Sequence, residues 1–344
     1  MQRVSDNHQP WLLVTGGAGY IGSHFVNRYL EQRSEGQVII VDDLSEGNRE
    51  AVDVLSKRFP ERIRFYHSKI GNSPIQEAFS THPVRAVVHF AASASVAHSQ
   101  RDPMGYLRNN VGETVLLLEA MTNAGVHNMV FSSTAAVYGT PDTELIREDV
   151  SKVPVNVYGK TKLMVEEMLS LLHERGMLSY VALRYFNAAG ADESGLIGEG
   201  HHEETHLIPI ILQAANGKRA SIKIYGNDYP TEDGTCIRDY IHVNDLADAH
   251  IAALDYLGEH PGTGMACNLG TGKGNSVREV LDLCRSITGQ EIHEEIAPRR
   301  DGDPPILVAG VDKANQVLRW KAKYSLEAII RTAWRWERNR LYCK

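Results

Sequence analysis

Tyr158 and Lys162 stand four residues apart in the run V-Y-G-K-T-K. Because an α-helix makes one turn in about 3.6 residues, the phenol and the ammonium project from the same helix face. A nearby cation favours phenolate over phenol and so lowers the tyrosine pKa from about 10 towards the range of a general base. Beside a bound dinucleotide, such a pair can take a proton from an alcohol while the cofactor takes the hydride. The spacing therefore indicates proton and hydride transfer at an alcohol carbon.

Hydroxyl groups precede this pair in the run Phe131-Ser-Ser-Thr134, which ends a short apolar segment. If that segment is a strand, its hydroxyls lie at the carboxyl edge of the sheet, where open α/β sheets bind ligands. A hydroxyl there can orient the substrate alcohol or pass on its proton. A lone Y-x-x-x-K is usually a solvated helix pair, but the combination is typical of a catalytic set. We therefore predict that Tyr158, Lys162 and Thr134 are catalytic.

A glycine-rich loop near the start of the chain holds Gly16, Gly19 and Gly22 in T-G-G-A-G-Y-I-G. Glycine lets the backbone turn tightly and bring N–H groups against a pyrophosphate at a helix N-terminus. Asp42 follows Gly22 by twenty residues, at the tip of the next apolar run. A carboxylate in that position accepts hydrogen bonds from ribose hydroxyls and repels a 2′-phosphate. The pattern predicts NAD as the cofactor, in preference to NADP.

Short apolar runs alternate with stretches of helical spacing over the first half of the chain. We predict strands at residues 11–14, 37–41, 63–66, 86–90, 129–132 and 180–183, and helices at 20–31, 48–58, 74–80, 104–124 and 156–174. This alternation is typical of a parallel sheet that is covered on both faces. The fold class that we expect is α/β, a Rossmann-type doubly wound parallel sheet with a smaller α/β substrate-binding lobe.

The pattern loosens after about residue 187, where glycine-rich and polar loop compositions become frequent. We expect an NAD-binding Rossmann domain at residues 11–186, with a return segment at about 240–270. Residues 187–239 and 271–344 would then form the substrate-binding domain. Within it, Ser276 and Glu279 have the spacing of a capping box and predict the start of a helix.

Composition and charge exclude several classes of function. The 344 residues are 42% hydrophobic and 23% charged, and the net charge of −7 gives no reason to expect a nucleic-acid partner. Residues 1–9 lack the apolar region of a signal peptide, and no apolar run reaches membrane-spanning length. Cys236, Cys267, Cys284 and Cys343 show no disulfide or metal spacing. We expect a cytoplasmic protein with no nucleic acid, no membrane and no metal as partner.

Longer motifs extend the pattern beyond the loop and the catalytic pair. They are T-G-G-A-G-Y-I-G-S-H, V-V-H-F-A-A, F-S-S-T-A-A-V-Y-G, Y-G-K-T-K-L-M-V-E, L-R-Y-F-N-A-A-G-A, Y-G-N-D-Y-P-T-E-D-G-T-C-I-R-D-Y-I-H-V and N-L-G-T-G-K-G-N-S-V. With them the chain resembles the extended short-chain dehydrogenase/reductase family, and within it the sugar-nucleotide epimerases, from about residue 11 to about residue 336.

The resemblance implies an isomerase that interconverts UDP-galactose and UDP-glucose through a transient 4-keto sugar, with tightly held NAD. It implies that Tyr158 removes the proton from the sugar 4-hydroxyl and that Thr134 hydrogen-bonds the 4-oxygen. Lys162 would lower the tyrosine pKa and bind the nicotinamide ribose. The sugar must be held loosely because both epimers must fit, so the binding energy should come from the UDP part.

The family pattern also implies which residues contact the cofactor and the nucleotide sugar. On the cofactor side they are Gly16, Gly19, Tyr20, Ile21, Gly22, Asp42, Asp43, Leu44, Ser45, Ile70, Phe90, Ala91, Ala92, Asn109, Ser132, Tyr158, Lys162 and Phe186. On the substrate side they are Thr134, Tyr158, Asn187, His206, Leu207, Lys223, Ile224, Tyr225, Arg238, Arg300, Asp303 and Leu307. The two arginines suit a diphosphate, which planar guanidinium groups can bind bidentately.

Some positions depart from the family pattern. Lys69 stands where relatives often have an aspartate that receives the adenine amino group, Ala94 where some have lysine, and His206 where some have asparagine. None of them touches the proton or hydride path, so they bear on cofactor affinity. Leu307 lies where tyrosine excludes a sugar acetamido group and a small residue admits it. Leucine is intermediate, so the acceptance of UDP-N-acetylhexosamines stays open.

Other functions on the same fold make different demands on the sequence. Nucleotide-sugar dehydratases need an acid and a base directly after the threonine, and decarboxylases need a glutamate there. Ala135 and Ala136 follow Thr134 in this chain and cannot move protons. Another NAD-dependent epimerase or dehydratase of the family remains the alternative. A non-catalytic NAD-sensing protein would not need Tyr158, Lys162 and Thr134 together.

A zinc-dependent hydrolase is a more remote alternative, because His202-Glu-Glu-Thr-His206 matches H-E-x-x-H. That site needs both histidines on one face of a regular helix, together with a third ligand. Gly198, Gly200 and Pro209 argue against such a helix, so the run is expected to be a polar loop at the nucleotide cleft.

The predicted helices at 104–124 and 156–174 are rich in Val, Leu and Met. Packing against the sheet explains much of this composition. Relatives use these two helices to form a dimer, so a homodimer is expected by analogy.

Overall fold

The computed structural model describes residues 10–201, 204–300 and 302–342. Its main element is a parallel sheet of seven strands in the order β12-β7-β5-β4-β1-β2-β3. The strands are β1 (Trp11–Thr15), β2 (Val38–Asp42), β3 (Ile63–His67), β4 (Val84–His89), β5 (Asn128–Thr134), β7 (Ser179–Tyr185) and β12 (Gly264–Leu269). The chain order reverses between β1 and β4, as in a Rossmann sheet, which places a ligand crevice at that point.

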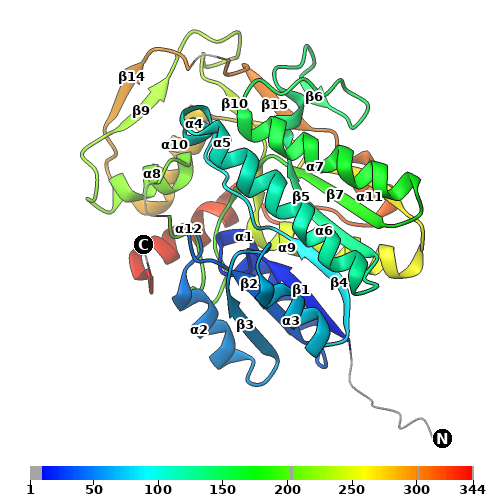
Figure 1. Cartoon of the computed structure of the whole chain (residues 1–344). Helices are drawn as coiled ribbons and strands as arrows, with labels where there is room; N and C mark the ends of the chain where they lie inside the picture. Colours follow the sequence, from blue (N-terminus) through cyan, green and yellow to red (C-terminus); the bar gives the residue numbers. More distant parts are fainter. Residues whose placement is uncertain (1–9, 202–203, 301, 343–344) are drawn as a thin grey trace, which may run out of the picture.

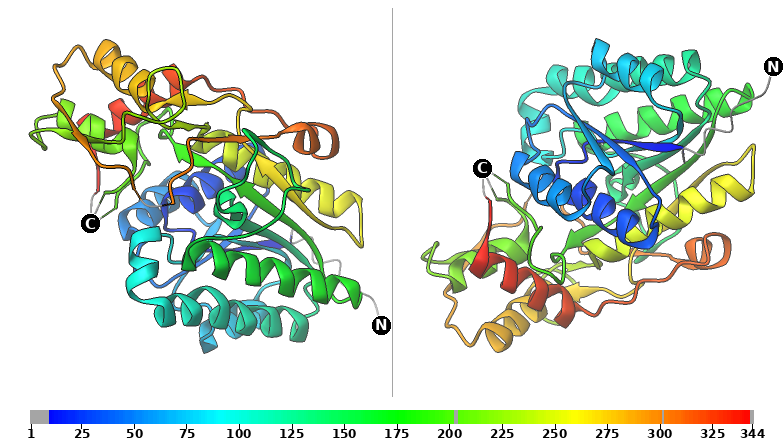
Figure 2. Two further views of the ribbon diagram at one scale, coloured as in Figure 1. Left: turned by 90° about the horizontal axis from the view of Figure 1, so that it is seen from above. Right: turned by 90° about the horizontal axis from the view of Figure 1, so that it is seen from below.

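Helices cover both faces of this sheet (Figures 1 and 2). One layer holds α1 (Tyr20–Gln32), α2 (Arg49–Arg58) and α9 (Val243–Glu259); the other holds α3 (Ser73–Thr81), α6 (Glu113–Asn123) and α7 (Val157–Glu174). Alternate residues of β1 serve the two layers, since Leu12 and Val14 pack towards α1 whereas Trp11 and Leu13 pack towards α3 and α6. Burial on both faces explains why inner strands such as β1 and β2 are continuous apolar runs. The predicted Rossmann-type α/β fold is confirmed.

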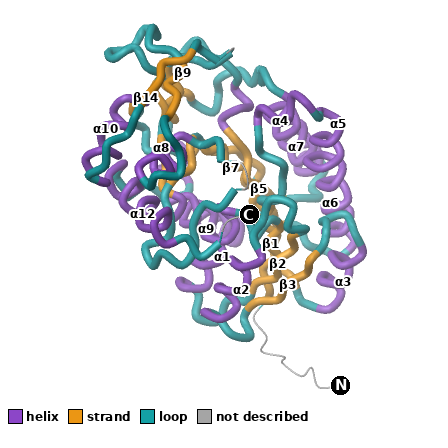
Figure 3. Tube along the Cα trace, turned by 90° about the vertical axis from the view of Figure 1, so that its left-hand side faces the viewer, coloured by secondary structure: helices purple, strands orange, loops and turns teal. Residues whose placement is uncertain are grey.

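The other described strands are short, and most of them belong to a smaller second lobe (Figure 3). They form a four-stranded sheet in the order β13-β10-β15-β6 and two pairs, β11-β8 and β14-β9; β6 and β11 come from the residue ranges predicted for the first lobe. These strands are β6 (Leu145–Ile146), β8 (Asn187–Ala189), β9 (Ile222–Tyr225), β10 (Ile237–Arg238), β11 (Tyr240–His242), β13 (Asn275–Ser276), β14 (Glu294–Ala297) and β15 (Ile306–Ala309). A separate apolar core joins α8 (Leu207–Ala215), α10 (Val277–Thr288) and α12 (Leu326–Asn339) to β9.

Most predicted elements appear within a few residues of their expected bounds, including the Ser276–Glu279 capping box at the start of α10. The helix predicted at 104–124 is formed by α5 (Pro103–Tyr106), a π-helical turn (Leu107–Gly112) and α6, which follow one another without a gap; α4 (Val96–Arg101) precedes them. A short 3-10 turn, η2 (Ala135–Tyr138), follows β5, and α11 (Asp312–Val317) follows β15. None of the helices in the described part of the chain has the length and apolarity that crossing a membrane requires.

Candidate active site

The glycine loop joins β1 to α1 at the reversal point of the sheet. Gly16 has φ +70°, and a Cβ there would lie 2.5 Å from the Ala91 nitrogen. A Cβ on Gly22 would lie 2.2 Å from the Gly16 oxygen. Only glycine allows this close approach. Gly19 caps α1 without a side chain, so the first N–H groups of the helix are left for an anion.

Asp42, at the end of β2, is the carboxylate beside this loop. Its Oδ2 accepts from the Ala18 N–H at 3.0 Å and its Oδ1 from the Leu44 N–H at 2.9 Å. The following turn is tied by Asp43, whose Oδ1 accepts from the Ser45 N–H at 2.9 Å. A helix N-terminus suited to a pyrophosphate and an oriented carboxylate suited to a ribose thus lie side by side. The residues present fit a dinucleotide such as NAD.

The other predicted cofactor residues lie along the same sheet edge. Phe90, Ala91 and Ala92 follow β4, and the Phe90 N–H donates to the Thr15 oxygen at 3.0 Å. Asn109 lies in the π-helical turn and its Nδ2 donates to Ser93 Oγ at 3.2 Å. Such turns are rare and are frequently found at functional sites. Lys69, one of the departures, has an exposed side chain.

The predicted catalytic side chains meet where β5 ends and α7 begins. Tyr158 and Thr134 are each 8% exposed and share a side-chain hydrogen bond. Lys162 Nζ lies 6.0 Å from the centroid of the Tyr158 ring and donates to the Ser132 carbonyl at 2.9 Å. The spacing of four residues therefore places the Tyr158 and Lys162 side chains on one face of α7, as expected. Because Thr134 is the last residue of β5, its hydroxyl reaches the tyrosine from the sheet edge.

Burial sets the charge states in this group. It raises the pKa of Tyr158 well above its usual value, and the hydrogen bond from Thr134 opposes that rise. Burial also lowers the pKa of Lys162 to about 7, against the charge of Glu166, which raises it. The sequence predicted that Lys162 lowers the pKa of Tyr158, but removal of water from the phenolate is the largest effect and the pKa is raised.

A buried polar network fixes α7 against the sheet. Arg184 on β7 donates to both carboxylate oxygens of Glu166 on α7, at 2.6 to 3.2 Å. Ser133 on β5 donates to Glu166 Oε1 at 2.5 Å. Nearer the start of α7, Thr161 Oγ1 accepts a hydrogen bond from Asn110 at 3.1 Å. These positioning residues were not predicted, because no local pattern pairs residues so far apart in the sequence.

The predicted substrate residues come from several elements of the second lobe. Asn187 begins β8, Leu207 begins α8, and residues 223–225 form most of β9. The Arg300 guanidinium carbon lies 4.0 Å from the centroid of the Tyr225 ring. Arg238 is buried on β10 and pairs with Asp303. Each of the two predicted arginine contacts is thus held by another predicted contact: Arg238 by Asp303, and Arg300 by Tyr225.

Leu307 on β15 packs in a small apolar cluster with Phe186 and Tyr138, next to Val137 and Ile146. Phe186 directly follows β7, and Tyr138 ends the η2 turn that follows Thr134. Leu307, which is predicted to control the space around the sugar, therefore lies close to the segment that follows Thr134, the predicted catalytic threonine.

His206, a predicted nucleotide contact, lies beside two buried carboxylates. Its Nδ1 lies 2.9 Å from Glu204 Oε1 and 2.8 Å from Glu199 Oε1, and His201 lies beside the same two carboxylates. Burial opposes the charge on His201, but the two carboxylates outweigh it and raise its pKa to about 9. Glu199, His201 and Glu204 were not singled out from the sequence, although the spacing of glutamates and histidines was a visible signal.

The zinc-hydrolase alternative required a regular helix through His202 and His206. His202 lies outside the described residues. Residues 204–206 precede α8, which starts at Leu207, and are not helical. The helical arrangement of H-E-x-x-H is therefore not formed by the described part of this run.

Known proteins are similar to this chain over most of its length. The model of the NAD dependent epimerase/dehydratase family matches residues 12–270. A UDP-glucose 4-epimerase from Halalkalibacterium halodurans is 49% identical over 330 residues, which cover 95% of this chain and 96% of the relative. One from Lacticaseibacillus casei is 46% identical and is covered to 97%.

Solved structures are similar over the same length. UDP-glucose-4-epimerase from Stenotrophomonas maltophila, with bound NAD and formylated UDP-arabinopyranose, superposes with a TM-score of 0.92 at 41% identity, covering 96% of this chain and 98% of that one. The Bifidobacterium longum enzyme, in complex with NAD+ and UDP, gives a TM-score of 0.89 at 35% identity with the same coverage. The chain belongs to the NAD dependent epimerase/dehydratase family.

Proposed function

We propose that the chain is an NAD-dependent isomerase that interconverts UDP-galactose and UDP-glucose. The observation that carries this proposal is the group of Tyr158, Thr134 and Lys162 at the same carboxyl edge of the parallel sheet as the glycine loop. Curated relatives at 46 to 49% identity over nearly the whole chain have this activity as their name. Ala135 and Ala136 after Thr134 do not favour a dehydratase, because neither can act as an acid or a base.

The first lobe would hold NAD through the residues implied by the family pattern. The N-terminus of α1 would bind the pyrophosphate, and Asp42 the adenosine ribose. Phe90, Ala91, Ala92 and Asn109 would line the adjoining edge, and Lys162 would bind the nicotinamide ribose. Bound NAD supplies the oxidising power that removes hydrogen from C4 and then returns it.

In the chemical step, Tyr158 takes the proton of the sugar 4-hydroxyl and gives it back after the sugar has turned. The hydrogen bond with Thr134 and the positive charge of Lys162 favour the phenolate that this step needs. Burial has the opposite effect, but it also strengthens each electrostatic contact. The base is therefore active only where Lys162 retains its proton.

The second lobe would hold the UDP part. Arg238 and Arg300 supply planar cations for the diphosphate, and Asp303 and Tyr225 keep them in place. Asn187, His206, Leu207, Lys223 and Ile224 complete the proposed nucleotide contacts. Leu307 would face the sugar. Strong contacts to UDP and few to the hexose allow the 4-keto sugar to turn over within the site.

Deuterium at C4 of UDP-galactose tests this mechanism. We expect the UDP-glucose that forms to retain the label at C4, because the hydrogen leaves and returns within one enzyme molecule. Mass spectrometry of the product measures the retention. Loss of the label to solvent during inversion would exclude the mechanism, and accumulation of a 4-keto-6-deoxy sugar would instead identify a dehydratase.

We also propose the division into an NAD-binding lobe (residues 11–186 with about 240–270) and a nucleotide-sugar-binding lobe (187–239 with 271–344). The location of β12 in the main sheet and the packing of α9 on α1 support the return segment. A cytoplasmic location agrees with the free cysteines at 236, 267 and 284 among the described residues.

A homodimer through α5, α6 and α7 is the assembly that we propose. Exposed apolar side chains on these helices support it, namely Met104, Val115, Leu116, Met164 and Leu171. Sedimentation should show a particle of twice the chain mass at micromolar concentration. A monomer at that concentration would exclude this assembly.

A further inference from the structure

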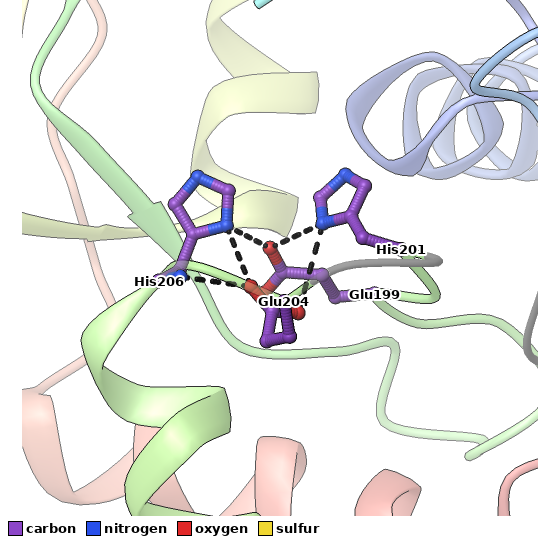
Figure 4. Close-up of side chains that lie close together, drawn as sticks. All are labelled: Glu199, His201, Glu204 and His206. Carbon is purple, nitrogen blue, oxygen red and sulfur yellow. Dashed lines mark hydrogen bonds and ion pairs between the residues drawn. The ribbon is translucent and has the colours of Figure 1, made fainter. Parts of the chain in front are cut away.

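Four potential metal ligands converge in the segment that leads into α8. They are Glu199, His201, Glu204 and His206, and Figure 4 shows both imidazoles turned towards the two carboxylates. One ligand atom from each residue lies within 4.8 Å of all the others. His206 is among the proposed nucleotide contacts, but Glu199, His201 and Glu204 have no role in the proposed function, so the cluster requires its own explanation.

Hydrogen bonds alone do not account for the cluster. Nδ1 of His206 lies 2.8 Å from Glu199 Oε1 and 2.9 Å from Glu204 Oε1. Nδ1 of His201 lies 3.2 Å from Glu199 Oε1 and 3.6 Å from Glu204 Oε2. Each Nδ1 carries at most one hydrogen, so two nitrogens cannot satisfy four contacts. Among the described residues, Glu199 Oε1 and Glu204 Oε2 are buried oxygens without a hydrogen bond of acceptable geometry.

The spacing of these atoms fits a tetrahedral ion. Zinc bonds of about 2.0–2.2 Å to nitrogen and oxygen place neighbouring ligand atoms about 3.3–3.6 Å apart. The four nitrogen–oxygen separations, which involve Glu199 Oε1 and both oxygens of Glu204, span 2.8 to 3.6 Å. One ligand atom from each residue lies within 4.8 Å of the others, so side-chain movement would bring one oxygen of each carboxylate to tetrahedral spacing. Two carboxylates also carry the charge that balances a divalent cation, and imidazole with carboxylate is a ligand set that zinc accepts.

We propose that Glu199, His201, Glu204 and His206 bind one zinc-class divalent cation through the two Nδ1 atoms and one oxygen of each carboxylate. This site differs from the H-E-x-x-H interpretation, because it does not use His202 and needs no helix. It replaces the expectation that the chain binds no metal. Four protein ligands leave no open coordination position for a substrate, so the proposed site is structural.

Neighbouring contacts hold the ligands in place. Glu204 Oε1 accepts from the backbone N–H groups of Thr205 and His206, at 2.9 and 2.8 Å. The Trp336 indole on α12 donates to the Glu199 carbonyl at 2.7 Å. The carboxylate side chains are 5% and 2% exposed, whereas that of His206 is 53% exposed. An ion can therefore enter from the histidine side into an already oriented pair of carboxylates.

The ion would fasten this segment directly before Leu207, the first residue of α8. Tyr20 of the glycine-loop helix lies nearby, since its ring centroid is 6.5 Å from that of His201, and its hydroxyl donates to the Gly190 carbonyl at 2.6 Å. The cation would thus stabilise the part of the second lobe that approaches the first.

Titration of the chelator-treated full chain, with its NAD in place, tests the site. Calorimetry with ZnCl2 alone should show one ion bound per chain in the wild type. His201→Gln and Glu199→Gln should each weaken binding by more than about 100-fold, because loss of a ligand exceeds the 10–100-fold effect of losing its outer partner. His260→Gln, which alters an exposed histidine at the end of α9, is the matched control and should bind as the wild type.

Cobalt provides a measurement that does not depend on the variants folding. Co2+ added to the chelator-treated wild type should give the intense visible absorption of a tetrahedral site, and ZnCl2 should remove it. Zinc should also raise the melting temperature of the wild type but not that of the two cluster variants. The proposal is overturned if wild type binds no zinc, if cobalt gives only weak octahedral bands, or if folded cluster variants keep wild-type affinity.

Discussion

At the scale of single residues, the burial of Tyr158 opposes the charged form of the phenol that the proposed reaction needs. The phenol is 8% exposed, and burial raises its pKa, which favours the neutral form. The hydrogen bond from Thr134 and the nearby ammonium of Lys162 favour the charged form. A base in this environment depends on both partners. The catalytic effect of the tyrosine should therefore be lost when its oxygen is removed, even though the aromatic packing remains.

Tyr158→Phe tests this dependence. We expect turnover of UDP-galactose to fall by about 10²–10⁴, which is the usual contribution of a positioned acid–base group. The content of NAD in the purified variant should change little, because Tyr158 is only one of many predicted cofactor contacts and its ring remains. Tyr180→Phe is the matched control, because it removes a tyrosine hydroxyl near the start of β7, at the other end of the strand from the sheet edge that carries Thr134. If the Tyr158 variant retains a near-normal rate, Tyr158 is not the acid–base group of the reaction.

Leu307 is the second residue-scale test. Since it packs against Phe186 and Tyr138, a larger side chain would intrude into the proposed sugar space. Leu307→Tyr should lower kcat/KM for UDP-N-acetylgalactosamine relative to UDP-galactose by about 10–200-fold, and Leu307→Ala should raise that ratio. Competing both substrates in one assay measures the ratio directly. A ratio that is equal in all three proteins would remove Leu307 from the sugar site.

At the scale of elements, the Glu166–Arg184 pair determines how α7 lies against β7. Both side chains are buried, at 7% and 5% exposure, and the pair is bidentate. Glu166→Ala leaves Arg184 charged without its carboxylate, and should lower the free energy of unfolding by about 3–5 kcal/mol. Urea denaturation measures it.

Replacing both partners separates charge burial from packing. Glu166→Leu combined with Arg184→Met removes both charges and fills a similar volume, so most of the lost stability should return. Tyr138 and Ser133 also contact the pair, at 2.7 and 2.5 Å, and each loses one hydrogen bond in this double variant. A double variant that is as unstable as Glu166→Ala would show that these hydroxyl contacts, rather than the unpaired charge, dominate.

The elements also show where sequence patterns are sufficient. Strands β1 and β2 are buried on both faces, so each appears as an apolar run and was predicted closely. Strand β12, at the edge of the main sheet, is partly exposed and was not predicted. The two-residue strands β6, β10 and β13 are too short to show any period and were not predicted. The π-helical turn at Leu107–Gly112 has ordinary helical spacing, so its wider hydrogen-bond pattern is set by tertiary contacts.

The same reasoning applies to the candidate site. Gly16, Gly22 and Asp42 are recognisable because the chemistry of a phosphate and a ribose demands those residue types at that spacing. Glu199 and His201 escaped prediction because their ligand atoms converge through the path of an irregular loop. No periodicity encodes that path, and only the folded chain shows which glutamates and histidines meet.

At the scale of the whole molecule, buried histidines couple stability to pH. His89, His242 and His250 are buried, and burial lowers their pKa values to about 3, 3 and 4. Each is neutral in the folded chain and would take up a proton in the unfolded chain below its ordinary pKa of about 6.5. Stability from these groups is therefore fully present above pH 6.5. As pH falls, the unfolded state binds more protons, and the folded state loses stability.

His250→Phe tests this coupling at one position. The ring lies against Phe25 and Phe90, with centroids at 6.1 and 4.7 Å, so a phenyl group should fit there. Between pH 6.5 and about 4, the free energy of unfolding of the wild type should fall faster than that of the variant, by up to about 1.4 kcal/mol per pH unit. Urea denaturation at several pH values measures both slopes. His260→Phe alters an exposed histidine on the same helix and should keep the wild-type slope, whereas equal slopes for His250→Phe and the wild type would contradict the neutral buried state.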